Sequence, residues 1–435
     1  MRDLLLMPIF FGVVVMALRQ PWIGVILFAW ISVMNPHRLT YGFAYDMPLA
    51  LIAAGVTVFG IVFGKQRFRF PLTAPTITLI LFIAWMGLTT LTAIHPESSF
   101  DLFVRALKTL FMVLVATAVI QDRQHIHVLL WTLVLSLAFY GVKGGLFTIA
   151  SGGGSRVWGP PDSLVNGNNE IAVAFAMIIP LMYYLGTTFH NAWYRRAMYV
   201  AIFLTTVAAL GTQSRGALLA VMAMSAMLWL KSPHKWRLAL GALILGLVIF
   251  AFMPESWWER MATIGTYKED GSAMGRVNAW QMAVNIALDR VMGAGFDAWT
   301  PFTYELYSPI RDRVPLVAHS IYFHVLGDHG FVGLALFLTF WFVTYWCAGS
   351  VRRDTESVEE LSWARDMSRM IQVGLVGYFV GGAFLSLAYW DVPYFLMVLV
   401  VALRRYVTEA KPALVAARDL GRNRPSSTDA RQSGA

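Results

Sequence analysis

Residues 125–150 read HIHVLLWTLVLSLAFYGVKGGLFTIA, an apolar run in which Lys143 is the one charged side chain apart from histidine. A helix needs about 20 such residues to cross the roughly 30 Å hydrocarbon core of a bilayer. Similar stretches extend outward along the chain at 4–18, 22–34, 46–63, 73–93, 100–120, 168–186, 195–211, 215–231, 236–252, 319–349, 366–388 and 391–406. Because lipid offers no hydrogen-bond partners to the backbone, such spans must be helical. We therefore predict an all-α polytopic membrane protein with about 12–13 transmembrane helices and one long outer (periplasmic), partly helical loop.

The composition excludes two other classes of protein. The chain has 435 residues, of which 57% are hydrophobic and 14% are charged, against about 25% charged residues in soluble domains. This excludes a soluble globular enzyme, and a mean hydropathy of +0.59 excludes disorder over most of the length. Cys347 is the only cysteine, so an intramolecular disulfide and a cysteine metal site are excluded as well.

Basic residues set the expected orientation, because Lys and Arg concentrate in cytoplasmic loops. Fourteen in alternate loops, such as Arg195 and Arg352, and seven in the C-terminal tail make 21 of the 34 basic residues. Their side is assigned to the cytoplasm, so residues 254–317 face outward. Thirteen crossings would put Met1 outside and twelve would put it inside. We expect a multi-pass membrane protein whose long polar interval lies on the outer side.

These assignments divide the chain into four parts. We expect an N-terminal transmembrane bundle over 1–253, a periplasmic loop over 254–317, C-terminal transmembrane helices over 318–406, and a cytoplasmic, mostly disordered tail over 407–435. The first apolar segment resembles a signal peptide, but no small-residue cleavage site follows it, so we expect it to be retained. The net charge of +9 follows mostly from the inside-positive loops, and we expect no nucleic-acid partner.

Thirteen basic residues remain on the expected outer side, where the topology rule does not predict them. They are Arg2, Arg38, Arg105, Lys108, Lys143, Arg156, Arg215, Arg260, Lys268, Arg276, Arg290, Arg311 and Arg313. Arg105, Lys108, Lys143 and Arg215 fall within or at the ends of predicted membrane helices, where a cation is costly and is usually functional or paired. An anion held at the outer face would account for them.

Two arginines in recognisable surroundings are the strongest candidates for holding that anion. Arg215 opens a helix within GTQSRGALLA (211–220), and its guanidinium suits a phosphate. The alternative is an interfacial arginine that reaches lipid headgroups. Arg276, in the outer loop, is four residues before Trp280, so the two share a helical face. The alternative for this pair is a solvated arginine stacked on a tryptophan. The nearby Gly293-Ala294-Gly295 is too short for a phosphate loop.

A histidine stands where the outer loop returns to the membrane, in VAHSIYFHVLGDHGFVG (317–333). His319 could take a proton from an acceptor hydroxyl near neutral pH, and Ser320 and Tyr322 could orient it. The alternative is a histidine satisfied by headgroups or backbone. His324 and His329 are five residues apart, and we find no carboxylate at a metal-ligand spacing among the three histidines, so we expect no metal site.

Together these motifs resemble the O-antigen ligase superfamily of O-antigen ligases, O-antigen polymerases and protein O-oligosaccharyltransferases. The resemblance rests on AHSIY (318–322) followed by GFVG (330–333), on Arg276-x-x-x-Trp280, and on SRGA (214–217). The N-terminal portion, with MNPHR (34–38) and GNNE (167–170), is more similar to O-glycosylation ligases associated with exosortase A systems. One departure is that Arg290-Val291-Met292 stands where the family often has a proline before the Gly-x-Gly.

The resemblance implies a glycosyltransferase that moves a glycan en bloc from undecaprenyl diphosphate to an acceptor hydroxyl outside the inner membrane. It also implies a multi-pass protein of the bacterial inner (cytoplasmic) membrane, with its active site facing the periplasm. Arg215 and Arg276 would bind the donor diphosphate, with Arg105 and Lys108 as second candidates, and His319 would activate the hydroxyl with inversion at the anomeric carbon. No Asp-x-Asp motif is present to bind a divalent metal, so we expect metal-independent transfer and no cofactor. The expected partners are the lipid-linked glycan, the bilayer, and an acceptor that is a protein, lipid A-core or polysaccharide.

Three alternatives stay open at this point. A polymerase would share the donor and differ only in its acceptor, a second lipid-linked glycan. A transporter of lipid-linked glycans would carry charged or broken helices along a path through the whole membrane, whereas the unexplained cations gather at one face. A structural scaffold is the least attractive, because it gives the long basic loop no role.

Overall fold

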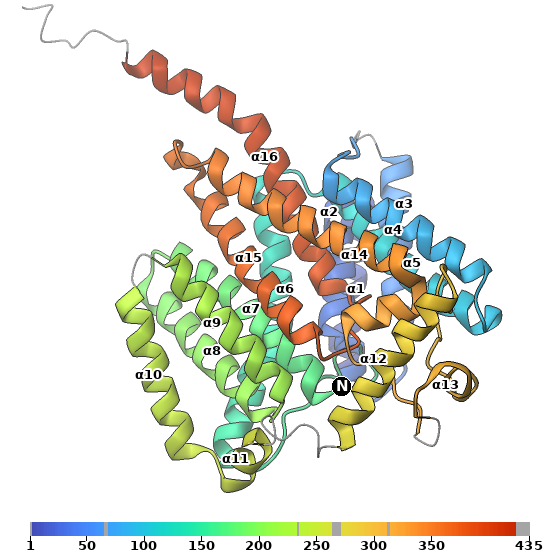
Figure 1. Ribbon diagram of the computed structural model, residues 1–435. Helices are drawn as coiled ribbons and strands as arrows, with labels where there is room; N and C mark the ends of the chain where they lie inside the picture. The colour runs from blue at the N-terminus through green and yellow to red at the C-terminus, as the bar shows by residue number, and fades with distance from the viewer. Residues whose placement is uncertain (1, 65–67, 233–234, 263–270, 311–313, 423–435) are drawn as a thin grey trace, which may run out of the picture.

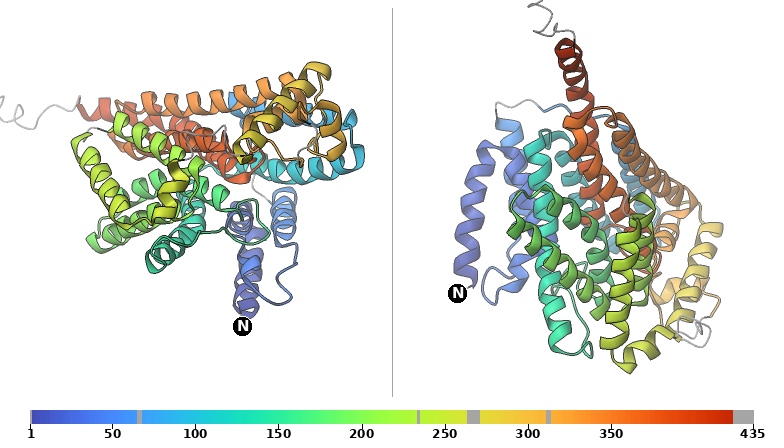
Figure 2. Two further views of the ribbon diagram at one scale, coloured as in Figure 1. Left: turned by 60° about the horizontal axis from the view of Figure 1, so that its bottom comes forward. Right: turned by 90° about the vertical axis from the view of Figure 1, so that its left-hand side faces the viewer.

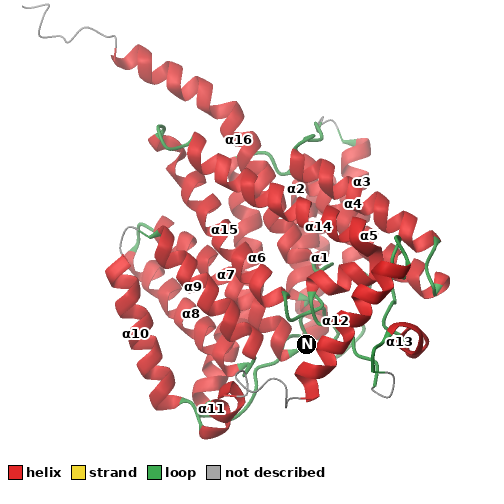
Figure 3. Cartoon of the chain, viewed as in Figure 1, coloured by secondary structure: helices red, strands yellow, loops and turns green. Residues whose placement is uncertain are grey.

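Helices form almost all of the regular structure in the computed structural model, which describes residues 2–64, 68–232, 235–262, 271–310 and 314–422 (Figure 3). Within these ranges there is no strand. The outer cations Lys268, Arg311 and Arg313, and the last part of the predicted tail, 423–435, lie outside the described residues. The all-α prediction is confirmed.

Ten long helices precede the loop and three follow it. The first ten are α1 (Arg2–Arg19), α2 (Pro21–Met34), α3 (Leu49–Phe63), α4 (Ala74–Leu91), α5 (Pro96–Val119), α6 (Arg123–Ala150), α7 (Asn168–Thr188), α8 (Ala192–Gly211), α9 (Arg215–Lys231) and α10 (Lys235–Phe252). The last three are α14 (Ile321–Asp354), α15 (Ser362–Gly382) and α16 (Asp391–Arg422). The loop between them holds α11 (Glu255–Ala262), α12 (Gly271–Asp289) and α13 (Pro301–Tyr307). The expected loop is thus partly helical.

Five of these helices are both long and apolar enough to cross a membrane: α4, α5, α6, α7 and α14. Two further apolar helices, α2 and α3, are shorter. The protein is therefore an all-α, multi-pass membrane protein, and the remaining segments among the predicted 12–13 crossings form helices without meeting both criteria.

The bundle has two distinct ends. The loop helices α11–α13 gather at one end together with the start of α1, and the C-terminal part of α16 projects from the other (Figures 1 and 2). We call the former the loop end.

The core lies around α7 and the first half of α16, whose side chains are almost all buried. α7 packs against α6, α8, α9 and α15, and α16 packs against α5, α14 and α15. These two sequences are apolar on every face, which is the pattern of a helix surrounded by other helices.

The structure corrects two segment assignments. Residues 407–422, which we placed in a mostly disordered tail, continue α16 as a helix, where Arg405 and Glu409 form an ion pair one turn apart (3.0 Å). The segment predicted as one crossing over 319–349 is a helix interrupted at Gly330, where φ is 65° and ψ is −171°. Hydropathy missed this break because the apolar residues after Gly330 dominate the average over the segment, although Asp328 and His329 stand directly before it.

Candidate functional site

The interruption of α14 is where the outer loop docks. The turn after α12 donates two backbone hydrogen bonds to the half-helix before Gly330, from the Ala294 amide to the Gly327 carbonyl and from the Gly295 amide to the Asp328 carbonyl, both 2.9 Å. Gly293, with a φ of 69°, lies so close that a Cβ there would stand 2.6 Å from the Gly330 nitrogen. The Gly-Ala-Gly stretch therefore joins the end of α12 to α14, a packing role that its sequence alone did not reveal.

The docked loop holds the His319 segment by its backbone. The Trp280 indole Nε1 donates to the Ala318 carbonyl (2.7 Å), and the Trp280 ring stacks on Phe323 with centroids 5.0 Å apart. On the other side, the His319 amide donates to Ser386 Oγ (3.1 Å). His319 itself has a φ of 43°, a left-handed conformation that is uncommon for a residue other than glycine. Its side chain thus projects from a backbone fixed by two other segments.

The surroundings of His319 favour the neutral form of its ring. Burial, and secondarily the positive charge of Arg276, lower the pKa of His319 below its usual range. A histidine with such a pKa is neutral near pH 7 and is able to accept a proton. Arg276 lies one turn before Trp280 on α12, so the two residues predicted to share a helical face both act on the His319 segment.

Glu170 is a site residue that the sequence reasoning named only as part of a motif. It lies in the first turn of α7, and its charge and that of Arg276 interact. Next to it, the Asn168 side chain donates to the Thr212 carbonyl (2.8 Å) in the turn before α9. The signal available in the sequence was a carboxylate at the start of an otherwise uncharged helix. GNNE (167–170) thus links α7 both to Arg276 and to the Arg215 region.

Arg215 is the first residue of α9, in a turn whose arginine side chains donate to backbone carbonyl groups. Ser214 caps the helix, its Oγ accepting from the Ala217 amide (3.1 Å). Arg215 Nε donates to the Arg260 carbonyl (3.1 Å), and Arg260 Nε donates to the Gln213 carbonyl (2.8 Å), which ties α9 to α11. These bonds fix both guanidinium groups at the loop end of the bundle.

The segment between α15 and α16, residues 383–390, connects the two halves of the site. A Cβ on Gly216 would stand 3.4 Å from the Phe384 Cβ, so this segment touches the first turn of α9. Two residues later, Ser386 accepts the hydrogen bond from the His319 amide. Arg215, Arg276 and His319 therefore come from different elements but share one region at the loop end.

Ser320 and Tyr322 do not contact the His319 ring through their hydroxyl groups in this structure. The Tyr322 hydroxyl donates to the Phe379 carbonyl on α15 (3.0 Å). The Ser320 hydroxyl is buried without a hydrogen-bond partner among the described residues, while its carbonyl accepts from the His324 amide (2.8 Å). In this structure Ser320 and Tyr322 therefore do not orient the His319 ring by hydrogen bonds, and their contribution is to the position of α14, which begins directly after Ser320.

Arg105 and Lys108 lie apart from the other two donor candidates. Both are exposed on α5, which packs against α2, α4 and α16 rather than against α9 or α12. α5 and α9 stand on opposite sides of the bundle (Figure 1). The structure thus brings Arg276 to His319 and links the turn of Arg215 to the His319 segment through residues 383–390, whereas Arg105 and Lys108 lie apart on α5.

The prediction that no carboxylate stands at a metal-ligand spacing among the three histidines is wrong. Asp328 stands one helical turn after His324, and His324 Nε2 lies 3.3 Å from Asp328 Oδ2, so a carboxylate does stand at a ligand-like spacing. The Tyr389 hydroxyl also donates to Asp328 Oδ2 (3.0 Å). Among the described residues, however, no group of three His, Cys, Asp or Glu side chains is arranged to hold a metal ion.

Two family models match this chain. Residues 1–190 match one described as a family of unknown function (DUF5935), and residues 200–338 match one described as O-Antigen ligase. No curated protein matches the chain. The second match contains Arg215, Arg276, Trp280 and His319. It shows that residues 200–338 are similar to the O-antigen ligase family, which supports a ligase function of the glycosyltransferase type.

Proposed function

We propose that the protein transfers a glycan en bloc from undecaprenyl diphosphate to an acceptor hydroxyl at the periplasmic face of the inner membrane. The observation that carries this proposal is the placement of His319, with its lowered pKa, beside the charge of Arg276 on a backbone held by Trp280 and Ser386. In this proposal the exosortase-associated O-glycosylation ligases are the nearest subgroup, and residues 254–317 form the periplasmic loop.

The chemistry assigns one task to each side chain. The acceptor oxygen attacks the anomeric carbon, the bond from that carbon to the diphosphate oxygen breaks, and the electron pair stays on the diphosphate. His319 takes the proton of the acceptor hydroxyl. Arg215 and Arg276 stabilise the negative charge that develops on the diphosphate. Attack from the side opposite the leaving group inverts the configuration.

No metal or general acid is assigned in this scheme. Diphosphate leaves as a stable anion, so the departing oxygen does not need a proton from a carboxylic acid of the glycosidase type. Glu170 is placed to hold Arg276 through their opposite charges when no donor is bound. Binding of the diphosphate then gives Arg276 a second, more strongly charged partner.

The test compares wild type, His319→Ala and the matched control His190→Ala at equal membrane expression in the native cell. His190 is exposed in the turn after α7, whereas it is the opposite end of α7, at Asn168, that contacts the turn before α9. Undecaprenyl-diphosphate-linked glycan and glycan attached to protein, lipid or polysaccharide are quantified by mass spectrometry. We expect His319→Ala alone to accumulate the donor and to lose one conjugate, which identifies the acceptor. A change in chain length alone would favour the polymerase, and unchanged transfer would refute the role of His319.

A further inference from the structure

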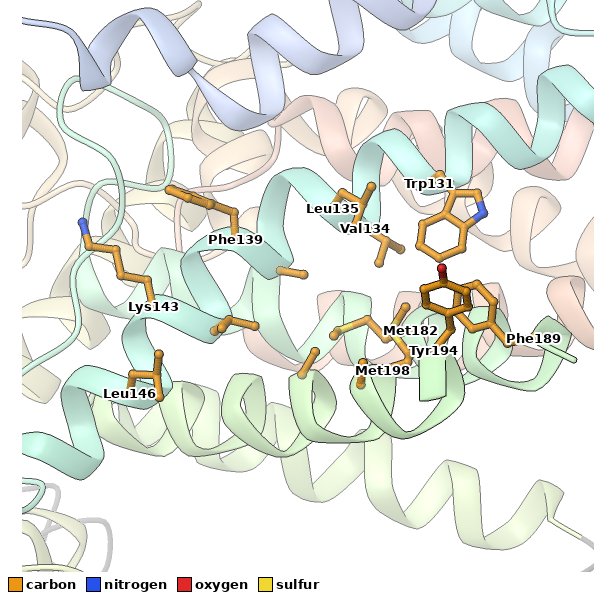
Figure 4. Close-up of a pocket in the computed structure, with 14 residues that line it drawn as sticks. Trp131, Val134, Leu135, Phe139, Lys143, Leu146, Met182, Phe189, Tyr194 and Met198 are labelled. Atoms are coloured by element: carbon orange, nitrogen blue, oxygen red, sulfur yellow. The ribbon is translucent and has the colours of Figure 1, made fainter. Parts of the chain in front are cut away.

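Two grooves on the surface of the bundle differ in the charges beside them. The groove between α6 and α8 has a volume of about 710 Å³, and Lys143 is the single charged residue of its lining (Figure 4). A second groove, of about 450 Å³, lies between α14 and α15 and has an apolar and aromatic lining. Tyr345 stands at one end of it, where Lys231 Nζ donates to the Tyr345 hydroxyl (3.4 Å) and to Gln372 Oε1 (2.7 Å). The second groove therefore adjoins a cation from a third helix, α9.

Lys231 has two other cations as neighbours. It is half-buried, and the positive charges of Arg352 and Arg369 both act on it. The helices that carry these arginines pack together here, since the Ser368 hydroxyl of α15 donates to the Ala348 carbonyl of α14 (2.5 Å). Arg352 stands one turn beyond this bond on α14, and Arg369 stands directly beside it on α15. Three cations from three helices therefore converge at the end of the groove.

No carboxylate in the described part of the chain balances these three charges, because none forms an ion pair with any of them. At the same end of the bundle, Asp354 and Glu409 pair with arginines of α16 instead. The Arg352 Nε is buried and has no hydrogen-bond partner among the described residues. A cation held among membrane helices is costly unless it is paired or functional. The three cations therefore indicate a site for an anion.

The position of this site in the bundle indicates where the anion comes from. With residues 254–317 on the outer side, the opposite end of the bundle, where α14 ends and α15 begins, faces the cytoplasm (Figure 1). The cytoplasmic leaflet carries anionic lipids, and basic pockets between helices on this side bind phosphorylated headgroups. Arginine and lysine donate short, charge-assisted hydrogen bonds to phosphate oxygens. A lipid phosphate would thus supply the negative charge that the described carboxylates do not.

The groove has the length of a fatty acyl chain within one leaflet. Tyr345 and Leu338, both in the lining, are seven residues apart on α14, which corresponds to about 10 Å along the helix. Tyr322 extends the lining beyond Leu338, and one leaflet supplies about 15 Å of hydrocarbon. Leu338 and Phe342 are exposed, so a chain can enter from the bilayer. A free phosphate ion would use the cations but would leave the groove without an occupant.

From the three converging cations, the buried Arg352 nitrogen and the adjoining groove, we propose that the protein binds an anionic glycerophospholipid of the cytoplasmic leaflet. Its phosphate lies on Lys231, Arg352 and Arg369, and one acyl chain lies between α14 and α15. The site is separate from the candidate donor site, which is at the loop end.

The bound acyl chain also supports the helix pair beside His319. Tyr322 and Phe379 line the groove away from Lys231, and the Tyr322 hydroxyl donates to the Phe379 carbonyl (3.0 Å), which joins α14 to α15. Tyr322 is three residues after His319. An occupied groove therefore stabilises this joint. The effect on transfer rests on the proposed function, whereas binding of the lipid does not.

The test is photolabelling of the purified full-length protein in phosphatidylcholine nanodiscs that contain phosphatidylglycerol with a photoreactive group in one acyl chain. Labelled peptides are mapped by mass spectrometry, and we expect labels on α14 and α15 along the groove. Lys231→Gln should lower these labels about tenfold, the loss expected for one hydrogen bond to a charged group. Adding Arg352→Gln and Arg369→Gln to it should abolish them. Val376→Trp, which fills the groove without removing a charge, should abolish them as well.

The controls separate this site from the transfer reaction and from bulk lipid. Arg196→Gln and Val200→Trp, at exposed positions on α8, are the matched variants and should label like wild type. His319→Ala should also keep the labels, so loss of transfer and loss of the lipid site are distinguishable. Unchanged labelling in Lys231→Gln and Val376→Trp would overturn the proposal. Equal labelling of the groove by photoreactive phosphatidylcholine would overturn it too, because the cations would then select nothing, and so would displacement of the label by inorganic phosphate, which would show a site for the free ion.

Discussion

Replacing Gly330 with alanine tests whether the joint between the loop and α14 positions the site. Gly330 has a φ of 65° and a ψ of −171°, a region that is essentially restricted to glycine and that costs other residues about 1–3 kcal/mol. Its Cβ would also stand 2.2 Å from the Val291 carbonyl oxygen, and overpacking of this kind adds about 1–3 kcal/mol. Because the obstacle is backbone, no side-chain rotation relieves it, so we expect a total cost of about 2–6 kcal/mol.

The cheapest relief is to move the end of α12 away from α14, which breaks the hydrogen bonds of the Ala294 and Gly295 amides. Hydrogen exchange at these two amides should therefore accelerate, the apparent thermal midpoint at a fixed scan rate should fall, and transfer should drop sharply even in folded protein. Gly55→Ala on α3 is the matched control, since a Cβ there meets nothing within 4 Å and alanine is the better helix former by about 1 kcal/mol. Wild-type exchange, midpoint and transfer in Gly330→Ala would refute the reasoning.

Three further substitutions probe the site itself. Trp280→Phe keeps the stacked ring but loses the hydrogen bond to Ala318, worth about 1 kcal/mol, so transfer should fall about fivefold at unchanged expression; an unaltered rate would show that the bond does not position His319. Transfer should rise with pH through the lowered pKa of His319, which lies below the usual value of about 6.5. Arg276→Gln removes a positive charge that disfavours the protonated ring, so it should move this acid limb of the pH–rate profile to higher pH. An acid limb that stays in place would contradict the assignment. Glu170→Gln should leave Arg276 without its acidic neighbour, so the apparent affinity for the donor should change more than the maximal rate. Kinetics at varied donor concentration measure both quantities, and a change in the maximal rate alone would contradict the prediction.

Hydropathy predicts the depth of side chains in the membrane but not their position around the bundle. Hydropathy reports where along the bilayer normal a residue lies, so Arg105, Lys108 and Arg215 could all be expected near one face. It carries no information on which helices are neighbours, and the structure separates α5 from α9. Arg276 and Trp280, by contrast, are related by helical periodicity alone, and their shared face follows from a spacing of four residues.

The break at Gly330 and the long-range contact of Glu170 were not predicted from the sequence, for a different reason. Asp328 and His329 stand directly before Gly330, but the apolar run that follows dominates the average hydropathy, so the whole segment scores as one span. Glu170 acts through Arg276, which is more than 100 residues away in the chain, and no short pattern encodes that pairing. The helical continuation of α16 beyond residue 407 depends on pairs such as Arg405 and Glu409, which a composition-based reading counts as polar.

The candidate site draws on both matched regions of the chain. Asn168 and Glu170 belong to residues 1–190, whereas Arg215, Arg276 and His319 belong to residues 200–338. Ser386, which holds the His319 amide, lies beyond both matches. Because the first region supplies the carboxylate that interacts with Arg276 and the bond to the turn before α9, it takes part in building the site, and its role cannot be reduced to anchoring the chain in the membrane. If the proposed transfer is correct, fragments that contain only 200–338 will bind the donor poorly, since Arg276 and the Arg215 turn would each lack the contact that α7 provides.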